Sequence, residues 1–472
     1  MLFLGIDVGT QGVRCAAVDE KGTVHAQTDR AFAQLNAAAL ENYREQLPED
    51  WWEALKAALR ELCTRVDASE IAALSLDGTS GTVVPIDTSC QPLCPALMYN
   101  DARSKKEASE LAELAREHEE KLGYTFNPSY ALPKIKWCLN NGIHAARFAN
   151  QTDYIVGKLS GEYGVTDYSN ALKMGYDLVD LRWSEYIGAY GVDVRSLPTV
   201  VKNGEYIASV SRAAAEETGL CEGLKIYAGT TDGIASSVAA GLAEPGDWAS
   251  VLGTTLVVKG ITKEIIRSST GSVYSHRHPQ GWWMPGGASN AGGVYLNNRF
   301  GKENFEEYNR QIGALLPTGE LCYPFDGKGE RFPFYAPEMI PFNTVPEDRL
   351  KNYAAAMEGV GYVERMIYEL LERGGADVSE SINTVGGGNK SREWLEIRAS
   401  ILAKPLQLPK YADASVGSAM IAAAGAYFGT LSAAVTNMCV IENTIEPNMA
   451  YIGKYNEIYE QFCEMCRPYM GE

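Results

Sequence analysis

Hydrophobic residues along the chain alternate between short continuous runs and stripes at helical spacing, and their order predicts a mixed α/β unit in the first half. Apolar runs predict strands over residues 1–6, 13–18, 71–76 and 82–86. Between the second and third strands, apolar residues recur every three or four positions and predict a helix over 49–66, with a stripe of Trp52, Leu55, Leu59, Leu62 and Val66. Both periods in one stretch are typical of a sheet covered by helices.

The second half repeats this layout. A strand pair is expected over 248–260, then a long helix, then a strand that ends at Gly386; the apolar stripe of the helix is Met357, Val360, Val363, Ile367 and Leu371. Between the halves, over 239–247, small residues give way to a Pro-Gly turn. We therefore predict two lobes, 1–243 and 244–472, with 239–247 as their hinge.

Two stretches share one finer pattern, an apolar strand, a Gly-Thr turn and a second apolar strand. The first, 5–19, has Gly9, Thr10 and Gln11 at its turn, and the second, 250–261, has Gly253, Thr254 and Thr255. Glycine permits a left-handed backbone and a close approach to phosphate, and threonine adds a hydroxyl donor. Because strands follow both turns, and no G-x-x-x-x-G-K-[ST] occurs, dinucleotide and P-loop sites are excluded. Ordinary turn chemistry explains either hairpin alone, whereas the matched pair favours phosphate binding.

A third motif, AGTTDG over 228–233, places a carboxylate between an apolar strand at 224–227 and a small-residue helix at 234–241. Free amides at a helix N-terminus keep a carboxylate ionised. An ionised carboxylate suits a base that accepts a proton from a hydroxyl. Asp232 is thus a helix cap, a catalytic base or both.

Composition and charge restrict the partners of this chain of 472 residues. Its length and its 46% apolar residues are sufficient for large hydrophobic cores. The sequence has no apolar run of about 18 residues, the length that a bilayer-spanning helix needs. A net charge of −18 disfavours nucleic acid and anionic membranes, which favours a small-molecule partner. The start of the chain and ten scattered cysteines predict a reduced, cytoplasmic protein. Mg²⁺ is expected with any nucleotide, because carboxylates such as Asp7 and Asp232 would otherwise repel its phosphates.

Five motifs occur in order: IDVGTQGVR, AGTTDG, LGTT, GERFPF and GGGNKSREWLEI. Together they resemble the FGGY family of carbohydrate kinases over essentially the whole chain. The resemblance implies a two-lobed, actin-like and hexokinase-like ATPase fold of the ribonuclease-H type, with the active site in the cleft between the lobes. The segments LDGTSGTVVPID and MYNDARS are most similar to ketopentose kinases of the D-ribulokinase-like branch.

The resemblance also implies roles for individual residues. Asp232 corresponds to the catalytic base, and Asp7 to the carboxylate that holds Mg²⁺ near the transferred phosphoryl group. ATP is expected to contact the first turn, the second turn and a glycine-rich stretch; these residues are Gly9, Thr10, Gln11, Gly253, Thr254, Thr255, Gly387, Gly388 and Asn389. Lys134 fits a family pattern of apolar packing with a surface lysine.

Substrate choice is predicted from the segment after Asp77. Glycerol kinases typically carry Arg-Glu, and xylulokinases Met-His, where this chain has Thr79 and Ser80. Small hydroxyls there would bind a sugar beside Asp7 and Asp232, unless the two residues only end a strand. Asp101 and Arg103 either line the same site or pair with each other.

The predicted function is ATP-dependent phosphorylation of a ketopentose, with D-ribulose first and D-xylulose or another polyol as the alternative. A nucleotide-switched scaffold such as actin or an Hsp70-type chaperone is the alternative from a different class. The expected partners are a small sugar and ATP, with neither nucleic acid nor membrane, and the resemblance is compatible with a homodimer.

Overall fold

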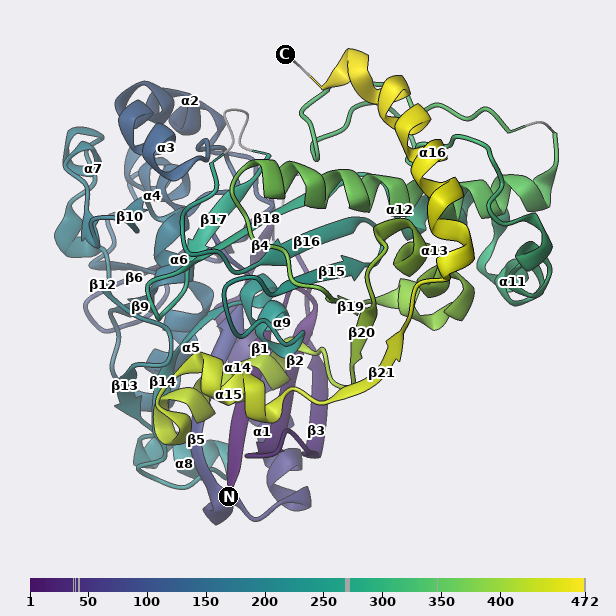
Figure 1. The fold of residues 1–472 in the computed structure, drawn as a ribbon. Helices are drawn as coiled ribbons and strands as arrows, with labels where there is room; N and C mark the ends of the chain where they lie inside the picture. The colour runs from purple at the N-terminus through teal and green to yellow at the C-terminus, as the bar shows by residue number, and fades with distance from the viewer. Residues whose placement is uncertain (37, 39, 41–42, 268–271, 346, 471–472) are drawn as a thin grey trace. The chain divides into compact units, whose positions relative to one another are not determined.

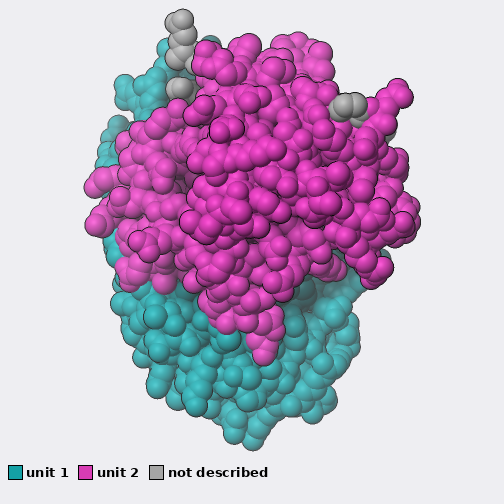
Figure 2. Space-filling model, turned by 45° about the vertical axis from the view of Figure 1, so that its right-hand side comes forward, with its two compact units in different colours: residues 1–239, 276–282, 411–440 teal, residues 240–275, 283–410, 441–472 magenta. Residues whose placement is uncertain are grey.

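The computed structural model describes residues 1–36, 38, 40, 43–267, 272–345 and 347–470 (Figure 1). The chain divides into two compact units, drawn in teal and magenta in Figure 2. Unit 1 comprises Met1–Ala239, His276–Trp282 and Tyr411–Val440, and unit 2 comprises Ala240–Ser275, Trp283–Lys410 and Ile441–Glu472. The first division falls inside the predicted join at 239–247. The prediction that all of 244–472 forms one lobe misses the return of Tyr411–Val440 to unit 1.

Unit 1 is built on a six-stranded sheet with the order β13-β14-β5-β1-β2-β3. The strands are β1 (Leu2–Val8), β2 (Gly12–Asp19), β3 (Val24–Ala31), β5 (Ile71–Gly78), β13 (Tyr206–Ser209) and β14 (Lys225–Thr231). Strands β14, β5 and β1 run parallel, and the outer pairs are antiparallel. The predicted strands at 1–6, 13–18 and 71–76 are therefore confirmed.

The predicted strand at 82–86 is shorter than expected and lies outside this sheet. It is reduced to β6 (Val84–Ile86), which pairs with β8 (Arg147–Ala149). Pro85 has no amide hydrogen, so a two-stranded ribbon accommodates it better than a central strand. Other short strands are β4 (Glu45–Gln46), β7 (Ala96–Leu97), β9 (Val165–Asp167), β10 (Tyr176–Asp177), β11 (Arg182–Trp183) and β12 (Thr199–Val201).

The predicted first helix is confirmed as α1 (Pro48–Arg65), which packs on β2 and β3. Trp51 and Trp52 are both buried, and Trp51 Nε1 donates to Gln46 Oε1 at 2.8 Å. Most of the remaining helices of unit 1 lie between β5 and β14: α2 (Lys105–Leu114), α3 (Arg116–Leu122), α4 (Ala131–Asn140), α5 (Gln151–Ser160), α6 (Tyr168–Lys173), α7 (Tyr186–Ala189) and α8 (Arg212–Thr218).

The returning segment brings α14 (Ala414–Ala423) and α15 (Leu431–Met438) into unit 1. Helix α14 packs on β1, β5 and α9 (Asp232–Ala239). The approach is close, because a Cβ atom on Gly5 would lie 1.7 Å from Ser415 O, and one on Gly417 would lie 1.9 Å from Ala235 O. Only glycine permits these two contacts. They explain how a segment so distant in the sequence packs against the sheet of unit 1.

Unit 2 is built on a seven-stranded sheet with the order β17-β18-β16-β15-β19-β20-β21. Its strands are β15 (Trp248–Leu252), β16 (Leu256–Gly260), β17 (Tyr274–Arg277), β18 (Trp283–Ser289), β19 (Ile382–Val385), β20 (Leu406–Pro409) and β21 (Ile441–Ile445). Its helices are α10 (Gly293–Phe300), α11 (Phe305–Ile312), α12 (Arg349–Arg373), α13 (Arg392–Leu402) and α16 (Met449–Cys466). The predicted hairpin, long helix and strand into Gly386 are confirmed.

Helix α12 forms the centre of the unit 2 core and buries its whole predicted apolar stripe. A fully buried ion pair joins it to α13, with Arg398 Nε 2.7 Å from Glu364 Oε2. Across the described residues no single helix is long and apolar enough to cross a membrane. One bent pair, Ala414–Phe428 with Leu431–Met438, reaches that length and apolarity only when taken together.

Candidate active site

Charged side chains meet in unit 1 at the carboxyl ends of the parallel strands β1, β5 and β14. Asp7 on β1 is the register partner of Asp77 on β5 and of Arg14 on β2. Thr231 ends β14 opposite Gly78, and Asp232 follows it. Three aspartates therefore share the sheet edge at which parallel α/β sheets bind their ligands.

Arg14 compensates the charge of the buried Asp7. Its Nη2 lies 2.5 Å from Asp7 Oδ2, and its Nη1 lies 4.0 Å from Asp413 Oδ2. Burial raises the pKa of Asp7 to about 6, and the nearby guanidinium opposes that rise. Asp7 is consequently ionised at neutral pH.

Asp77 is as fully buried as Asp7, and it lies beside that carboxylate. Burial and the charge of Asp7 raise the pKa of Asp77 well above its ordinary value, although Ser418 Oγ donates to Asp77 Oδ2 at 2.6 Å. Two buried carboxylates in contact disfavour a second charge. Of the pair, Asp77 is the residue that retains a proton.

The first Gly-Thr turn is closed by a bond from Gly9 N to Gly12 O at 3.0 Å. Gly9 does not use the left-handed backbone that glycine permits, because its φ lies outside that region. The glycine provides space instead: a Cβ atom there would lie 3.2 Å from Arg14 Nη2 and 3.7 Å from Asp7 Oδ1. The turn thereby lies directly against the charged pair.

A cavity of about 840 Å³ opens beside this turn. It is lined by residues 9–14 of the turn, residues 27–31 of β3, Tyr99 and Asp232. A second cavity of about 320 Å³ is lined by Asp7, Arg14, Asp232, Gly233, Ser236 and residues 412–414. Arg14 and Asp232 line both cavities, so the candidate base, the first turn and the Asp7–Arg14 pair lie around two neighbouring cavities of unit 1.

Asp232 is the first residue of α9, as predicted, and its Oδ1 accepts from Gly233 N at 2.7 Å. The strand before it is fixed by close packing, since a Cβ atom on Gly229 would lie 1.6 Å from Leu76 O. Asn203 Nδ2 donates to Gly229 O at 2.5 Å, and Thr230 Oγ1 donates to Ser169 Oγ at 2.9 Å. Asp232 begins its helix and lines both cavities, and its role as the base stays a prediction.

The second Gly-Thr turn lies in unit 2, where Gly253 N donates to Thr255 O at 3.1 Å and Gly293 N donates to Gly253 O at 3.0 Å. Gly253 likewise has a φ outside the left-handed region. The glycine-rich stretch is its neighbour, since a Cβ atom on Gly388 would lie 2.6 Å from Leu252 Cδ2. Gly387 has open space beside it and Thr254 is exposed. The predicted nucleotide residues of unit 2 are thus brought together.

Asn389 is the exception among them. Its Nδ2 donates to Thr384 O at 2.7 Å, and its Oδ1 accepts from Thr384 Oγ1 at 3.1 Å. This side chain holds the end of β19 in place, so a contact with adenosine from this position would come from the backbone.

Residues 2–239 match the N-terminal domain of the FGGY family of carbohydrate kinases, and residues 248–426 match its C-terminal domain. The chain belongs to this family. Xylulose kinases of Staphylococcus epidermidis and Bacillus subtilis are each 27% identical to it, over 98% and 97% of this chain and 95% of each relative. The predicted family and enzyme class are confirmed.

Solved structures agree with this assignment. The xylulose kinase from Rhodospirillum rubrum is 26% identical with a TM-score of 0.88, over 99% of both chains. The glycerol kinase from Plasmodium falciparum is 16% identical with a TM-score of 0.85, over 100% of this chain and 98% of that one. The second likeness concerns the fold alone. The predicted α/β two-domain kinase fold is confirmed, and the kinase is favoured over a nucleotide-switched scaffold.

The hydroxyl of Thr79 is engaged in hydrogen bonds within unit 1. Thr79 is buried, its Oγ1 donates to Gln151 Oε1 at 2.6 Å, and it lies 2.7 Å from Thr82 Oγ1. The prediction that Thr79 contacts the sugar is therefore corrected to a structural role. Ser80 is only partly buried and stays the predicted sugar contact of this segment.

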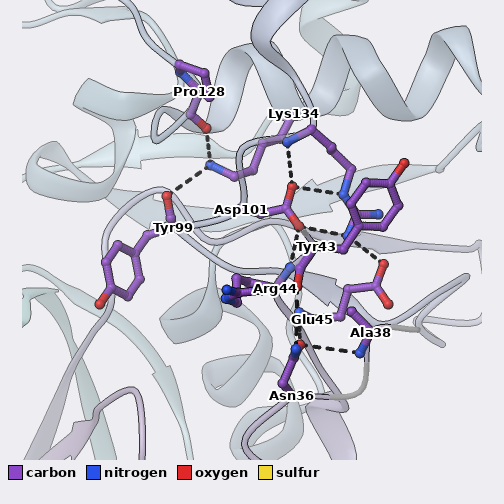
Figure 3. A network of polar contacts seen from close by, with 10 residues as sticks. Asn36, Ala38, Tyr43, Arg44, Glu45, Tyr99, Asp101, Pro128 and Lys134 are labelled. Atoms are coloured by element: carbon purple, nitrogen blue, oxygen red, sulfur yellow. Dashed lines mark hydrogen bonds and ion pairs between the residues drawn. The ribbon is translucent and has the colours of Figure 1, made fainter. Parts of the chain in front are cut away.

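Asp101 is likewise engaged, and Figure 3 shows the surrounding polar network. Arg103 Nε and Nη2 donate to its two oxygens at 2.8 and 2.7 Å, and Arg44 N donates to it at 2.7 Å. The Arg103 guanidinium lies 3.6 Å from the centroid of the Tyr43 ring. Of the two alternatives the structure has the pair, so Asp101 is removed from the predicted sugar contacts.

Lys134 was predicted at the surface, and this is wrong. It is fully buried, and its Nζ donates to Pro128 O at 2.6 Å (Figure 3). The same Nζ donates to Tyr130 O at 3.3 Å. Burial lowers the pKa of Lys134 to about 7. The hydrogen bonds from Nζ to these backbone carbonyls explain why an ammonium group is tolerated there.

Arg14, Asp77, Asp413 and Ser418 are site residues that the sequence analysis did not identify. Arg14 interrupts an otherwise apolar strand, and Asp77 ends an apolar run as Asp7 does, so both carried a visible signal. Asp413 and Ser418 carried none, since their relation to the first sheet depends on the return of residues 411–440.

Proposed function

We propose that this carbohydrate kinase transfers the γ-phosphoryl group of ATP to a hydroxyl of a ketopentose, D-xylulose first and D-ribulose second. Relatives named xylulose kinase support the first sugar. D-ribulose is favoured by the resemblance of residues 76–87 and 98–104 to the D-ribulokinase-like branch and by the Thr79–Ser80 pair. The bond from Thr79 to Gln151 weakens the second of these arguments. The observation that carries the proposal is Asp232, which begins α9 and lines the cavity that contains the first Gly-Thr turn.

The proposed reaction needs alignment and charge stabilisation more than covalent chemistry. The sugar oxygen attacks the γ-phosphorus, the bond to the β-γ bridging oxygen breaks, and ADP leaves. The hydroxyl proton passes to the Asp232 carboxylate. The amides at the start of α9 keep that carboxylate ionised, and the Gly9–Gly12 turn offers backbone amides and Thr10 to the transferred phosphoryl group.

The residues present fit Mg²⁺. Asp7 offers a buried carboxylate, and carboxylate oxygens are the ligands this ion prefers. Within the described residues no group of three or more metal-ligating side chains gathers. One carboxylate with waters and substrate phosphates is the usual Mg²⁺ arrangement in kinases. We therefore assign Mg²⁺ to Asp7, with Asp232 beside it, where the bound ion would offset phosphate charge.

A sugar panel tests the proposal. ADP release is measured with D-xylulose, D-ribulose, L-ribulose, ribitol and glycerol, and kcat/KM is compared. We expect a ketopentose to exceed glycerol by at least about 100-fold, since buried polar groups discriminate strongly among hydroxyl patterns. If no sugar stimulates ADP formation above the rate with water, the proposal fails. A preference for glycerol would remove the ketopentose assignment.

A further inference from the structure

Lys173 lies beside the candidate sugar segment and has no role in the chemistry described above. It is the last residue of α6 and is partly buried. A Cβ atom on Gly81 would lie 3.0 Å from Lys173 Cδ, so the aliphatic stem of the lysine packs on the turn that follows Ser80. Gly81 has φ +80°, a conformation that favours glycine. The backbone and the lysine stem therefore define this turn together.

The ammonium group of Lys173 lacks the partners that a desolvated cation ordinarily has. Among the described residues, its Nζ makes neither a hydrogen bond nor an ion pair. It lies over the Tyr130 ring, 5.6 Å from the ring centroid. Burial lowers the pKa of Lys173 to about 8, and the charge of Asp232 opposes this shift. Lysines removed from water are usually paired. A partly desolvated ammonium that interacts with Asp232 indicates a ligand.

Lys134 on α4 provides the contrast within the same region. It is the more deeply buried of the two lysines, yet its Nζ donates to backbone carbonyls of Pro128 and Tyr130. Its donors are used by the fold, whereas those of Lys173 are not. The charge of Lys173 also lowers the pKa of Lys134, after the larger effect of burial.

We propose that Lys173 donates hydrogen bonds to the acceptor sugar and so determines which hydroxyl is presented to Asp232. The inference rests on the proposed function, because it needs a polyhydroxy acceptor beside Asp232. An ammonium group has three donors and no acceptor, and it matches the carbonyl and hydroxyl oxygens of a ketose. Since the Thr79 hydroxyl is bound to Gln151, Lys173 and Ser80 are the donors that this segment offers to the sugar.

Lys173→Met tests the inference, because it keeps the stem on Gly81 and removes the ammonium. We expect the KM for the ketopentose to rise about 10-fold or more, the usual effect of losing a charged hydrogen bond, while the KM for ATP changes less than about twofold. Lys225→Met, an exposed lysine at the start of β14, is the matched control and leaves both values unchanged. An unchanged sugar KM in Lys173→Met would overturn the inference.

The pH dependence of kcat/KM for the sugar is a second test, because a purely structural role of Lys173 would not change it. The titratable groups that face Lys173 are Asp232 on α9, Tyr130 before α4 and Lys134 on α4. In the wild type, kcat/KM for the sugar should fall as pH rises through about 8, where Lys173 loses its proton. Lys173→Arg should restore sugar binding and remove that fall, because arginine stays charged. A fall that persists in both variants would contradict the inference.

These outcomes are distinct from those that test the proposed function. If the wild type phosphorylates no ketose, the proposed function fails. If it phosphorylates a ketose and Lys173→Met does so with the same sugar KM, only the role of Lys173 fails. If a sugar acid is the preferred substrate and its KM depends on Lys173, the inference stands and the ketopentose assignment falls.

Discussion

At the scale of single residues, the site is organised by one row of partners across neighbouring strands. Asp29, Arg14, Asp7 and Asp77 occupy matching register positions on β3, β2, β1 and β5. Opposed charges alternate along the first three positions, and Asp77 ends the row as a carboxyl group that retains its proton. This arrangement allows a buried Asp7 to stay ionised at neutral pH, which its proposed metal role needs.

Arg14→Met tests that electrostatic role. Asp7 is charged above its pKa of about 6, so wild-type kcat/KM should fall as pH decreases through about 6. Without the guanidinium, the pKa of Asp7 rises further and the fall should begin at a higher pH. Arg195→Met, a surface control, should leave the profile unchanged. An acid limb at the same pH in Arg14→Met would show that Arg14 does not support the charge of Asp7.

Ser80 and Thr79 give opposite predictions although they are adjacent. Ser80→Ala should weaken sugar binding by about 1 kcal/mol, the net value of one hydrogen bond. Thr79→Val should instead lower the thermal midpoint, because Gln151 Oε1 loses the hydroxyl that donates to it. Sugar titrations and thermal unfolding of both variants separate the two roles. Equal sugar affinity in Ser80→Ala and wild type would remove Ser80 from the site.

At the scale of elements, glycines set how closely helices approach the sheet that carries the site. Helix α14 reaches both β1 and α9 through Gly5 and Gly417. Helix α9 begins at Asp232, so its position against α14 also fixes the candidate base. The position of the proposed base therefore depends on a segment that lies far away in the sequence.

Gly417→Ala should disturb that contact. A Cβ atom 1.9 Å from Ala235 O cannot be accommodated without moving α9, and overpacking of this kind costs about 1–3 kcal/mol. We expect a lower unfolding midpoint and a reduced kcat. Gly453→Ala is the control, since this helical glycine of α16 has open space around it and alanine favours a helix. Wild-type kcat and stability in Gly417→Ala would contradict the proposed constraint.

In unit 2, Glu358 of α12 links this helix to α16 in the core. Its Oε1 accepts from Thr318 N at 3.0 Å and from Tyr455 Oη at 3.1 Å, and burial raises its pKa from 4.5 to about 7. The folded state therefore holds this proton more tightly than the unfolded state does. Its contribution to the free energy of unfolding decreases as pH rises from about 4.5 to about 7.

Glu358→Gln removes that pH dependence while keeping an acceptor oxygen. Relative to wild type, the variant should gain stability between pH 5 and pH 8, by up to about 3 kcal/mol for a shift of this size. Thermal unfolding at the two pH values measures the difference. Exposed Glu442→Gln is the control and should show none. A constant difference between Glu358→Gln and wild type would mean that Glu358 is ionised at both pH values.

The same elements explain what the sequence could predict. Asp7 and Asp232 were found because each comes at the end of a run that the sequence marks as a strand; Asp7 lies near the end of β1, and Asp232 directly follows β14. Strand β3 was missed because it lies at the sheet edge, where half of its residues are exposed and only two are buried. Lys134 was misplaced because the family pattern suggested a surface lysine, and only the fold reveals the carbonyls around it.

At the scale of the whole molecule, each unit carries one Gly-Thr hairpin on the same strand layout, and the family match covers both. Sequence order predicted this duplication and the position of the join. It could not predict that Tyr411–Val440 rejoins unit 1, because that contact links residues some 400 positions apart and depends on shape at Gly5 and Gly417. Asp413 and Ser418 enter the site by this route alone.

The central claim is that Asp232 accepts the proton of the sugar hydroxyl, and the most direct test is kcat of Asp232→Asn with the best ketopentose. We predict a decrease of about 10²- to 10⁴-fold, the usual contribution of a positioned base, with the sugar dissociation constant, measured by calorimetry, within about threefold of wild type. A kcat close to that of the wild type would contradict the account.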